Sequence, residues 1–142
     1  KLRAGAVVID DTYNANPDSV VAAVRALAAF RGERHLVLGD MGEVGLQGPA
    51  FHQELGKYTA QCGIEHFMTI GSLTKESHTA YLRERPTGDA RHFDDIDSLN
   101  RELVQNLQRF SDRNVCILVK GSRFMRMERV VQALIEGVKS CS

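Results

Sequence analysis

Two kinds of hydrophobic spacing alternate along this chain. Short runs rich in β-branched and aromatic residues predict strands at 6–11, 35–39, 66–70, 91–93 and 115–120. Between and after them, apolar residues recur every three or four positions, which predicts helices at about 17–30, 49–62, 73–83, 96–110 and 124–136. Strands that alternate with such helices form βαβ units. We therefore expect an α/β fold, with a Rossmann-like, mostly parallel sheet of about five or six strands and helices on both faces.

The ends of these predicted elements carry further expectations. Leu2 and Arg3 precede a glycine and leave room for an antiparallel strand at one edge of the sheet. Ser122 has the side chain of an N-cap for the last helix, and Gly137 is placed to cap its C-terminus. We therefore expect residues 138–142 to be frayed.

Size and composition indicate a single domain over residues 1–142 with an ordinary core. The formal net charge of +0 provides no strongly basic face, so neither nucleic acid nor a membrane is expected as a partner. The longest apolar stretch, 20–30, contains Arg25 and is too short to span a bilayer, and we expect no signal peptide. Three cysteines and five histidines lack metal-ligand spacing. We therefore expect a cytoplasmic protein with reduced thiols and no metal site.

The first polar segment that follows a predicted strand contains Asp10, Asp11, Tyr13, Asn14 and Asn16. Asn16 is a good helix N-cap, and its neighbours suit the turn before the helix. Capping does not need all five side chains, however, and ligands of open α/β sheets bind beyond the carboxyl ends of the strands. A carboxylate there can accept hydrogen bonds from ribose hydroxyls. Strand alternation points Asp10 and Asp11 to opposite faces, and the residues alone do not decide which one faces a ligand.

The second polar segment, 39–45, combines three glycines with Asp40 and Glu43. Glycine permits backbone conformations and close approaches that other residues do not, so this segment suits either a surface turn or a loop beside a ligand. No GxxxxGK[ST] motif occurs in the chain, which therefore lacks the usual phosphate loop.

The third polar segment is Lys120-Gly121-Ser122-Arg123, directly after the last predicted strand. Two cations at the predicted N-terminus of a helix oppose the helix dipole, so we expect an anion beside them. That anion is either a carboxylate or phosphate of a ligand, or a salt bridge from Lys120 to Asp10 or Asp11 across the sheet edge.

These three segments, in this order on an α/β scaffold, resemble the C-terminal domain of the Mur ligases. The resemblance rests on Asp-Thr-Tyr-Asn-Ala-Asn-Pro at 11–17, Leu-Gly-Asp-Met-Gly-Glu-Val-Gly at 38–45, and Leu-Val-Lys-Gly-Ser-Arg at 118–123, with Met127 and Glu128. It extends from about residue 5 to residue 137. The first and third motifs are typical of the branch that adds D-Ala-D-Ala. Thr12 and Val44 depart mildly from the Ser and Leu expected there.

The resemblance implies an ATP-dependent ligase of peptidoglycan synthesis that joins D-Ala-D-Ala to UDP-MurNAc-tripeptide through an acyl phosphate. In such an enzyme, a first domain holds the UDP-sugar and a central domain holds most of the ATP and Mg²⁺. The C-terminal domain closes over both. We therefore expect this chain to belong to a longer three-domain enzyme, to pack against its N-terminal and central domains, and to fold without catalysing the reaction alone.

The resemblance also assigns residues to ligands, with no catalytic residue in this chain. The side chains near the nucleotide would be Asp11, which would hold the ribose, together with Tyr13, Asn14 and Asn16. The residues that line the D-Ala-D-Ala site would be Lys120, Gly121, Ser122 and Arg123. Asp40 and Glu43 would belong to an active-site loop.

Three alternatives remain from the sequence. A sibling Mur ligase or a folylpolyglutamate synthase would share the fold but differ in the third segment. A phosphoacceptor receiver domain also has an acidic pair after its first strand and a lysine after its fifth. It needs an aspartate after its third strand, where this chain has Gly71 and Ser72. A non-catalytic interaction module is the third alternative, although it does not explain so many polar residues at one sheet edge.

Overall fold

The computed structural model describes the backbone of residues 3, 5–13, 15–42 and 44–141, and side chains as far as residue 137. Its sheet has five strands in the order β1-β5-β2-β3-β4, and every neighbouring pair is parallel. The strands are β1 (Ala6–Asp11), β2 (Glu33–Gly39), β3 (His66–Ile70), β4 (Asp89–Phe93) and β5 (Val115–Lys120). The helices are α1 (Pro17–Ala28), α2 (Gly48–Gln61), α3 (Thr74–Glu84), α4 (Ile96–Arg109) and α5 (Glu128–Cys141), with 3-10 turns η1 (Gly45–Gln47) and η2 (Arg123–Met125).

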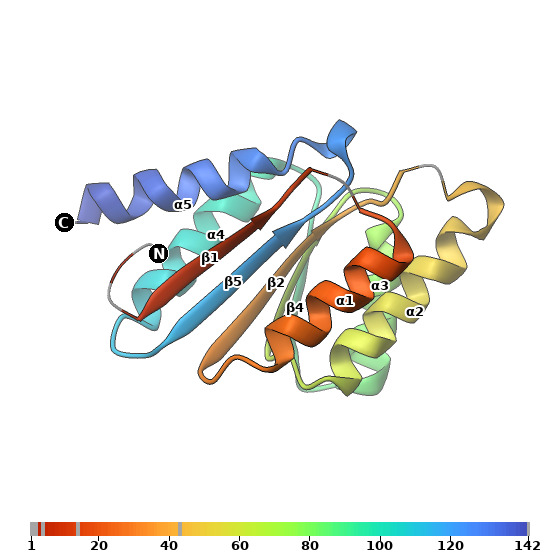
Figure 1. The fold of residues 1–142 in the computed structure, drawn as a ribbon, viewed down its shortest axis with the longest axis horizontal. Helices are drawn as coiled ribbons and strands as arrows, with labels where there is room; N and C mark the ends of the chain where they lie inside the picture. The colour runs from red at the N-terminus through yellow and green to blue at the C-terminus, as the bar shows by residue number, and fades with distance from the viewer. Residues whose placement is uncertain (1–2, 4, 14, 43, 142) are drawn as a thin grey trace.

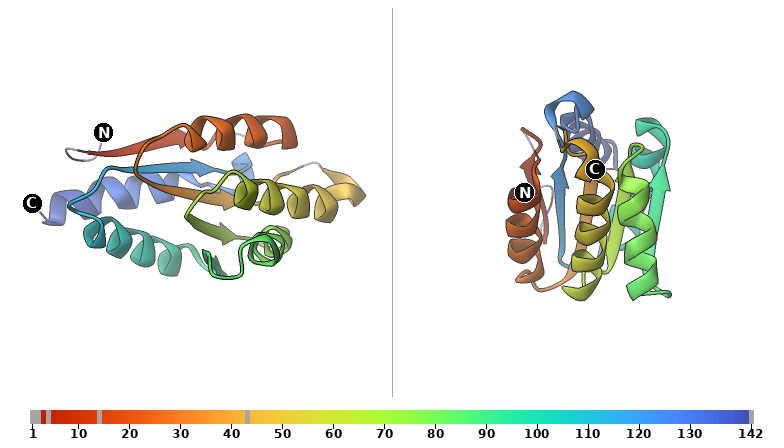
Figure 2. Two further views of the ribbon diagram at one scale, coloured as in Figure 1. Left: turned by 90° about the horizontal axis from the view of Figure 1, so that it is seen from below. Right: turned by 90° about the vertical axis from the view of Figure 1, so that its right-hand side faces the viewer.

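The sheet separates two hydrophobic cores (Figure 1). Alternate residues of β5 serve the two faces: Ile117 and Val119 pack with α4 and α5, whereas Cys116 and Leu118 pack with α1, α2 and α3. Figure 2 shows the sheet and its helices from two further directions. The prediction of a parallel α/β sheet covered on both faces is therefore confirmed.

The expectation of an extra antiparallel strand is not met in the described part of the chain. Arg3 makes one isolated antiparallel bridge with Ala6, and the turn between them uses Gly5 with a positive φ of 80°. Leu2 lies outside the described residues. A bridge of this length closes a tight turn and does not add a strand.

The prediction for the last helix is wrong at both ends. Residues 123–125 form the η2 turn, and Arg126 then adopts a left-handed conformation with φ of 53°, so α5 begins only at Glu128. Met127 is fully buried and packs on Gly39 and Gly121, which holds the start of the helix against the sheet. Gly137 lies inside α5 beside Val104 of α4 and is no C-cap, and the helix continues to Cys141 through the segment expected to fray.

The strand order argues against the receiver alternative. Receiver domains have the flavodoxin-like order 2-1-3-4-5, in which the first strand lies inside the sheet, between the second and the third. Here β5 is inserted between β1 and β2, and β1 lies at the edge. Within the described ranges, no helix has the length and apolar character needed to span a membrane.

Candidate functional site

The three polar segments meet at the carboxyl edge of the sheet. There β5 ends between β1 and β2, because Lys120 pairs in register with Asp11 on one side and Leu38 on the other. The helices that follow these strands leave on different faces: α1 and α2 cover one face, and α5 covers the other. Diverging helices of this kind open a crevice beyond the strand ends, which is the usual ligand position in open α/β sheets.

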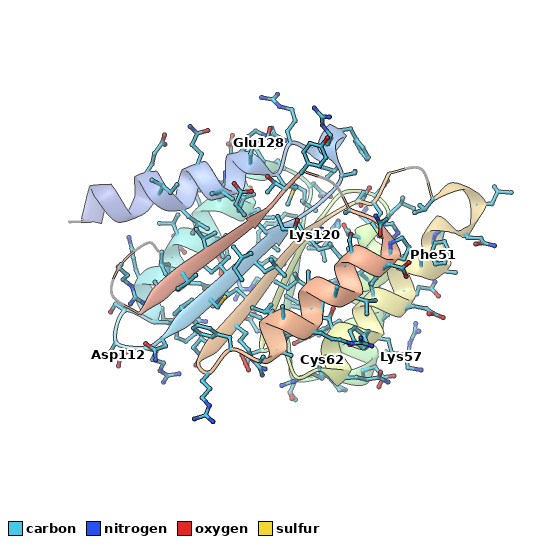
Figure 3. All side chains as sticks on the ribbon, viewed as in Figure 1. Phe51, Lys57, Cys62, Asp112, Lys120 and Glu128 are labelled. Atoms are coloured by element: carbon cyan, nitrogen blue, oxygen red, sulfur yellow. The ribbon has the colours of Figure 1, made fainter. Side chains whose placement is uncertain are left out.

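Lys120 and Asp11 form an ion pair at this edge. The Lys120 Nζ donates to Asp11 Oδ2 at 2.9 Å, and the exposed fraction is 2% for the Lys120 side chain and 44% for that of Asp11. Figure 3 labels Lys120 at the end of β5, among the strand ends. The sequence left two candidates for the anion beside these cations, a ligand or a protein carboxylate. The structure contains the second, as a salt bridge between Lys120 and Asp11.

The segment after β1 combines a cap with exposed groups. Asn16 Oδ1 accepts from the Ser19 N–H at 2.9 Å, and Ser19 Oγ accepts from the Asn16 N–H at 3.1 Å, so the predicted N-cap is confirmed as a capping box. Tyr13 is 73% exposed, and the Arg123 guanidinium lies 5.0 Å from its ring centroid. Asn14, predicted beside them, lies outside the described residues.

Asp40 is buried and holds the N-terminus of α3. Its carboxylate accepts from the N–H groups of Leu73 at 3.1 Å and Thr74 at 2.9 Å, and from Ser72 Oγ at 3.4 Å. A carboxylate in this position caps the helix and complements its dipole. The Asp40 carboxylate, predicted for an active-site loop, therefore faces the start of α3 and is not exposed to the crevice. Glu43, its companion in that prediction, lies outside the described residues.

Ser122 connects the third segment to the second. Its Oγ donates to the Asp40 carbonyl at 2.7 Å, and its N–H donates to the same carbonyl at 3.1 Å. The expected capping of the last helix by Ser122 is wrong, because η2 intervenes and the side chain makes no cap bond. Gly121 packs closely against Met127 and Gly39, so Arg123 is the member of this segment whose side chain is exposed.

Two clefts open along the crevice and share Arg123. A polar cleft of about 470 Å³ is lined by Asp10, Asp11, Thr12, Tyr13, Arg123 and Glu128. A mixed cleft of about 670 Å³ is lined by Ala15, Asn16, Pro17, Gly42, Val44, Phe51, Ser122, Arg123 and Phe124. The polar cleft offers carboxylate and hydroxyl groups to a ligand, and the mixed cleft offers apolar walls with a cation at one end.

Several lining residues were not predicted. Phe124, the first residue of the predicted last helix, is 65% exposed and lines the mixed cleft. The buried ring of His52 makes hydrogen bonds to two backbone groups near the glycine-rich segment. Its Nε2 accepts from the Met41 N–H at 3.1 Å, and its Nδ1 bonds the Gly48 carbonyl at 2.7 Å. No pattern in the sequence distinguished His52 from the other four histidines. No cluster of three metal-binding side chains occurs among the described residues.

Comparison with known proteins supports the resemblance. The family model "Mur ligase, glutamate ligase domain" matches residues 1–123. The chain belongs to the Mur ligase family. A UDP-N-acetylmuramoyl-tripeptide–D-alanyl-D-alanine ligase from Escherichia coli (strain K12) is 38% identical over 136 residues, which is 96% of this chain and 28% of the relative. Its counterpart from Bacillus subtilis (strain 168) is 31% identical over 96% of this chain and 29% of the relative.

Solved structures agree with this Mur ligase fold. MurF from Acinetobacter baumannii matches with a TM-score of 0.81 and 31% identity over 94% of this chain and 29% of that chain. MurF ligase from Thermotoga maritima, in complex with ADP, matches with a TM-score of 0.79 at 22% identity over 100% of this chain and 31% of that chain, a likeness of fold. The chain therefore spans less than a third of the length of the relatives it matches.

Proposed function

We propose that this Mur ligase domain is the C-terminal part of a three-domain, ATP-dependent ligase that joins D-Ala-D-Ala to UDP-MurNAc-tripeptide. ATP phosphorylates the tripeptide carboxylate, which gives ADP and an acyl phosphate. The amine of D-Ala-D-Ala then attacks the acyl carbon, the amide bond forms, and phosphate leaves. The reaction belongs to peptidoglycan synthesis, and because it uses ATP and a UDP-linked substrate we place it in the cytoplasm.

The observation that carries the proposal is the pair of clefts that share Arg123. The polar cleft presents Asp11, whose carboxylate suits a ribose, beside the exposed ring of Tyr13. The mixed cleft presents apolar walls from Val44 and Phe124 with Arg123 at one end, which suits a small apolar dipeptide with a free carboxylate. ATP, which activates the tripeptide carboxylate, and the dipeptide, whose amine attacks the activated carboxylate, are thereby given neighbouring positions. The names of the relatives at 38% and 31% identity support the same pair of ligands.

The clefts and the family resemblance together divide the residues between the two ligands. On the nucleotide side we propose Asp11 and Tyr13, which line the polar cleft, and Asn14 and Asn16, which the family resemblance implies although Asn16 lines the mixed cleft. On the dipeptide side we propose Gly121, Ser122 and Arg123, of which Arg123 supplies the contact to the carboxylate. ATP and Mg²⁺ are held mainly by the central domain in this proposal, and this domain completes the site when it closes.

This chain alone is expected to fold and to show no ligase turnover. The reason is that domain closure brings the activated carboxylate to the amine, and this chain offers no phosphate loop for ATP. The test measures phosphate release with ATP, UDP-MurNAc-tripeptide and D-Ala-D-Ala, for this chain and for the full-length enzyme. Turnover by this chain alone contradicts the division of labour. Failure of the full-length enzyme to use D-Ala-D-Ala, while another amine competes and reacts, favours a sibling ligase.

Arg123→Gln is expected to raise the KM for D-Ala-D-Ala in the full-length enzyme on the order of tenfold, because the variant loses a charged contact to the carboxylate. The KM for ATP is expected to change less. Steady-state kinetics with each substrate varied in turn checks this. Arg83→Gln is the matched control, since Arg83 lies exposed on α3 away from both clefts. An unchanged KM for the dipeptide in Arg123→Gln would remove Arg123 from the amine site.

A further inference from the structure

Lys120 is a buried lysine at the end of β5, and its ammonium faces a partner that its position in the sequence does not reveal. Lys120 is the last residue of β5, which lies between β1 and β2, and its side chain is 2% exposed. Strand alternation puts it on the same face as Cys116 and Leu118, beneath the helical layer that contains α1. A buried ammonium is unfavourable unless a partner of opposite charge faces it. Asp11, 109 positions away in the sequence, is such a partner, with Nζ to Oδ2 at 2.9 Å.

The two members of this pair differ in their access to the crevice. Asp11 is 44% exposed and lines the polar cleft together with Tyr13 and Arg123. Lys120 lines neither of the two clefts. The ammonium therefore approaches the Asp11 carboxylate from the side of the core, while a ligand approaches it from the crevice. An ion pair of this geometry fixes the carboxylate in one orientation before any ligand arrives.

We propose that Lys120 is a positioning residue for the nucleotide and not a ligand of the D-Ala-D-Ala carboxylate. Its charge holds Asp11 toward the polar cleft, where Asp11 accepts hydrogen bonds from the ribose hydroxyls. This inference rests on the proposed function and changes one part of it, because the family resemblance had assigned Lys120 to the dipeptide. Asp11 and Lys120 are also register partners, so the ion pair joins the side chains at the ends of the edge strand β1 and the interior strand β5.

The dipeptide carboxylate has a better partner in Arg123. Arg123 is exposed, lines both clefts, and presents a planar guanidinium that binds a carboxylate through two hydrogen bonds. For Lys120 to bind the dipeptide, its ammonium would have to leave Asp11 and carry its charge through a buried position. The two cations of the third segment therefore have separate tasks: Lys120 orients a protein carboxylate, and Arg123 receives a ligand carboxylate.

The test is steady-state kinetics of Lys120→Met in the full-length enzyme, with ATP and D-Ala-D-Ala varied separately. We expect the KM for ATP to rise on the order of tenfold, because a wrongly held carboxylate loses its hydrogen bonds to the ribose. The KM for D-Ala-D-Ala is expected to stay unchanged. Lys120→Arg keeps the charge and is expected to restore most of the affinity for ATP. Lys57→Met is the matched control, since Lys57 is exposed on α2, far from Lys120 (Figure 3).

Each other outcome contradicts a defined part of the argument. A rise in the KM for D-Ala-D-Ala would make Lys120 a dipeptide ligand and overturn the inference. A loss of active enzyme and a lower melting temperature, with both KM values unchanged, would leave the ion pair only a structural role and would also overturn it. Asp11→Asn separates this from failure of the proposed function. If Asp11→Asn folds, ligates and keeps its KM for ATP, the nucleotide side itself is wrongly assigned.

Discussion

Replacing Asp40 by alanine is expected to lower the free energy of unfolding of this domain by about 3 kcal/mol. The Asp40 side chain is 5% exposed or less, and its carboxylate accepts the N–H groups of Leu73 and Thr74 at the start of α3. Alanine leaves these donors without their acceptor and removes the negative charge from the positive end of the helix dipole. The expected loss therefore exceeds that of an exposed helix cap, which is typically about 1 kcal/mol.

Urea unfolding of the isolated chain, followed by circular dichroism, measures this effect. Asp112→Ala is the matched control, because Asp112 is exposed in the loop before β5, at the opposite edge of the sheet (Figure 3). Asp40→Asn is expected to lie between the wild type and Asp40→Ala, because an amide oxygen can still accept but carries no charge. Equal stability of Asp40→Ala and Asp112→Ala would mean that the cap contributes nothing.

The expected consequence for function follows from the backbone of the same residue. The Asp40 carbonyl accepts both the Oγ and the N–H of Ser122, so Asp40 joins the start of α3 to the wall of the mixed cleft. Gly71 is required in this arrangement: its φ is 117°, and a side chain there would collide with the Asp40 carboxylate. Asp40 thus connects the start of α3 to the wall of the mixed cleft from within the core.

The position of the site was predictable from the sequence, whereas several roles within it were not. Five apolar runs marked the strands, and parallel strands place their carboxyl ends together, so three distant polar segments had to meet. Which side chains turn inward depends on partners that only the fold supplies. Ser122 finds its acceptor 82 positions away, and Lys120 finds Asp11 109 positions away. Local patterns that suggest caps and exposed cations carry no information about such contacts.

The prediction of the last helix was wrong for a different reason. Phe124, Met127, Val130, Val131 and Leu134 recur at helical spacing, and the pattern alone predicts one helix through all of them. The left-handed backbone at Arg126 interrupts that helix, and a non-glycine residue in this conformation is not visible in an apolar pattern. As a result, Phe124 is exposed and lines the mixed cleft.

A second group of charges lies at the opposite, amino edge of the sheet. His66 on β3 places Nδ1 2.7 Å from Asp89 Oδ2 and Nε2 2.8 Å from Glu33 Oε2, so its ring joins β4 to β2. Burial is the largest single effect and raises the pKa of the Asp89 and Glu33 carboxyls. The hydrogen bonds and charges of His66, together with those of Arg91 beside Asp89 and of Arg113 beside Glu33, outweigh it, so both pKa values lie below the usual range. His35 stacks on His66 with ring centroids 4.2 Å apart, and Phe110 packs on both rings.

This arrangement makes His35 the main source of acid sensitivity in the fold. His35 is 1% exposed, and both of its ring nitrogens lack a hydrogen-bond partner among the described residues. Burial lowers the pKa of the His35 imidazole from 6.5 to about 3, and the neighbouring His66 charge acts in the same direction against the weaker opposite effects of Glu33 and Asp89. Between these two values the unfolded chain holds a proton on His35 that the folded chain does not. Stability contributed by the neutral ring is therefore complete above pH 6.5 and is lost as the pH falls toward 3.

His35→Leu is expected to flatten the acid limb of the stability curve. Over the whole window the wild type is expected to lose up to about 5 kcal/mol through His35, since each unit of pKa shift corresponds to about 1.4 kcal/mol. The variant has no such group. Burial also lowers the pKa values of His78 and His92 from 6.5, so these rings leave a smaller acid sensitivity in the same window, and the lowered pKa values of the Glu33 and Asp89 carboxyls add a further loss of stability below about pH 4.5. Urea unfolding at intervals from pH 7 to pH 4 checks this.

His35→Phe, which keeps an aromatic ring between His66 and Phe110, is expected to behave like His35→Leu, because the proton and not the stacking sets the slope. Parallel stability curves for the wild type and both variants between pH 6.5 and 4.5 would assign the acid sensitivity to other groups.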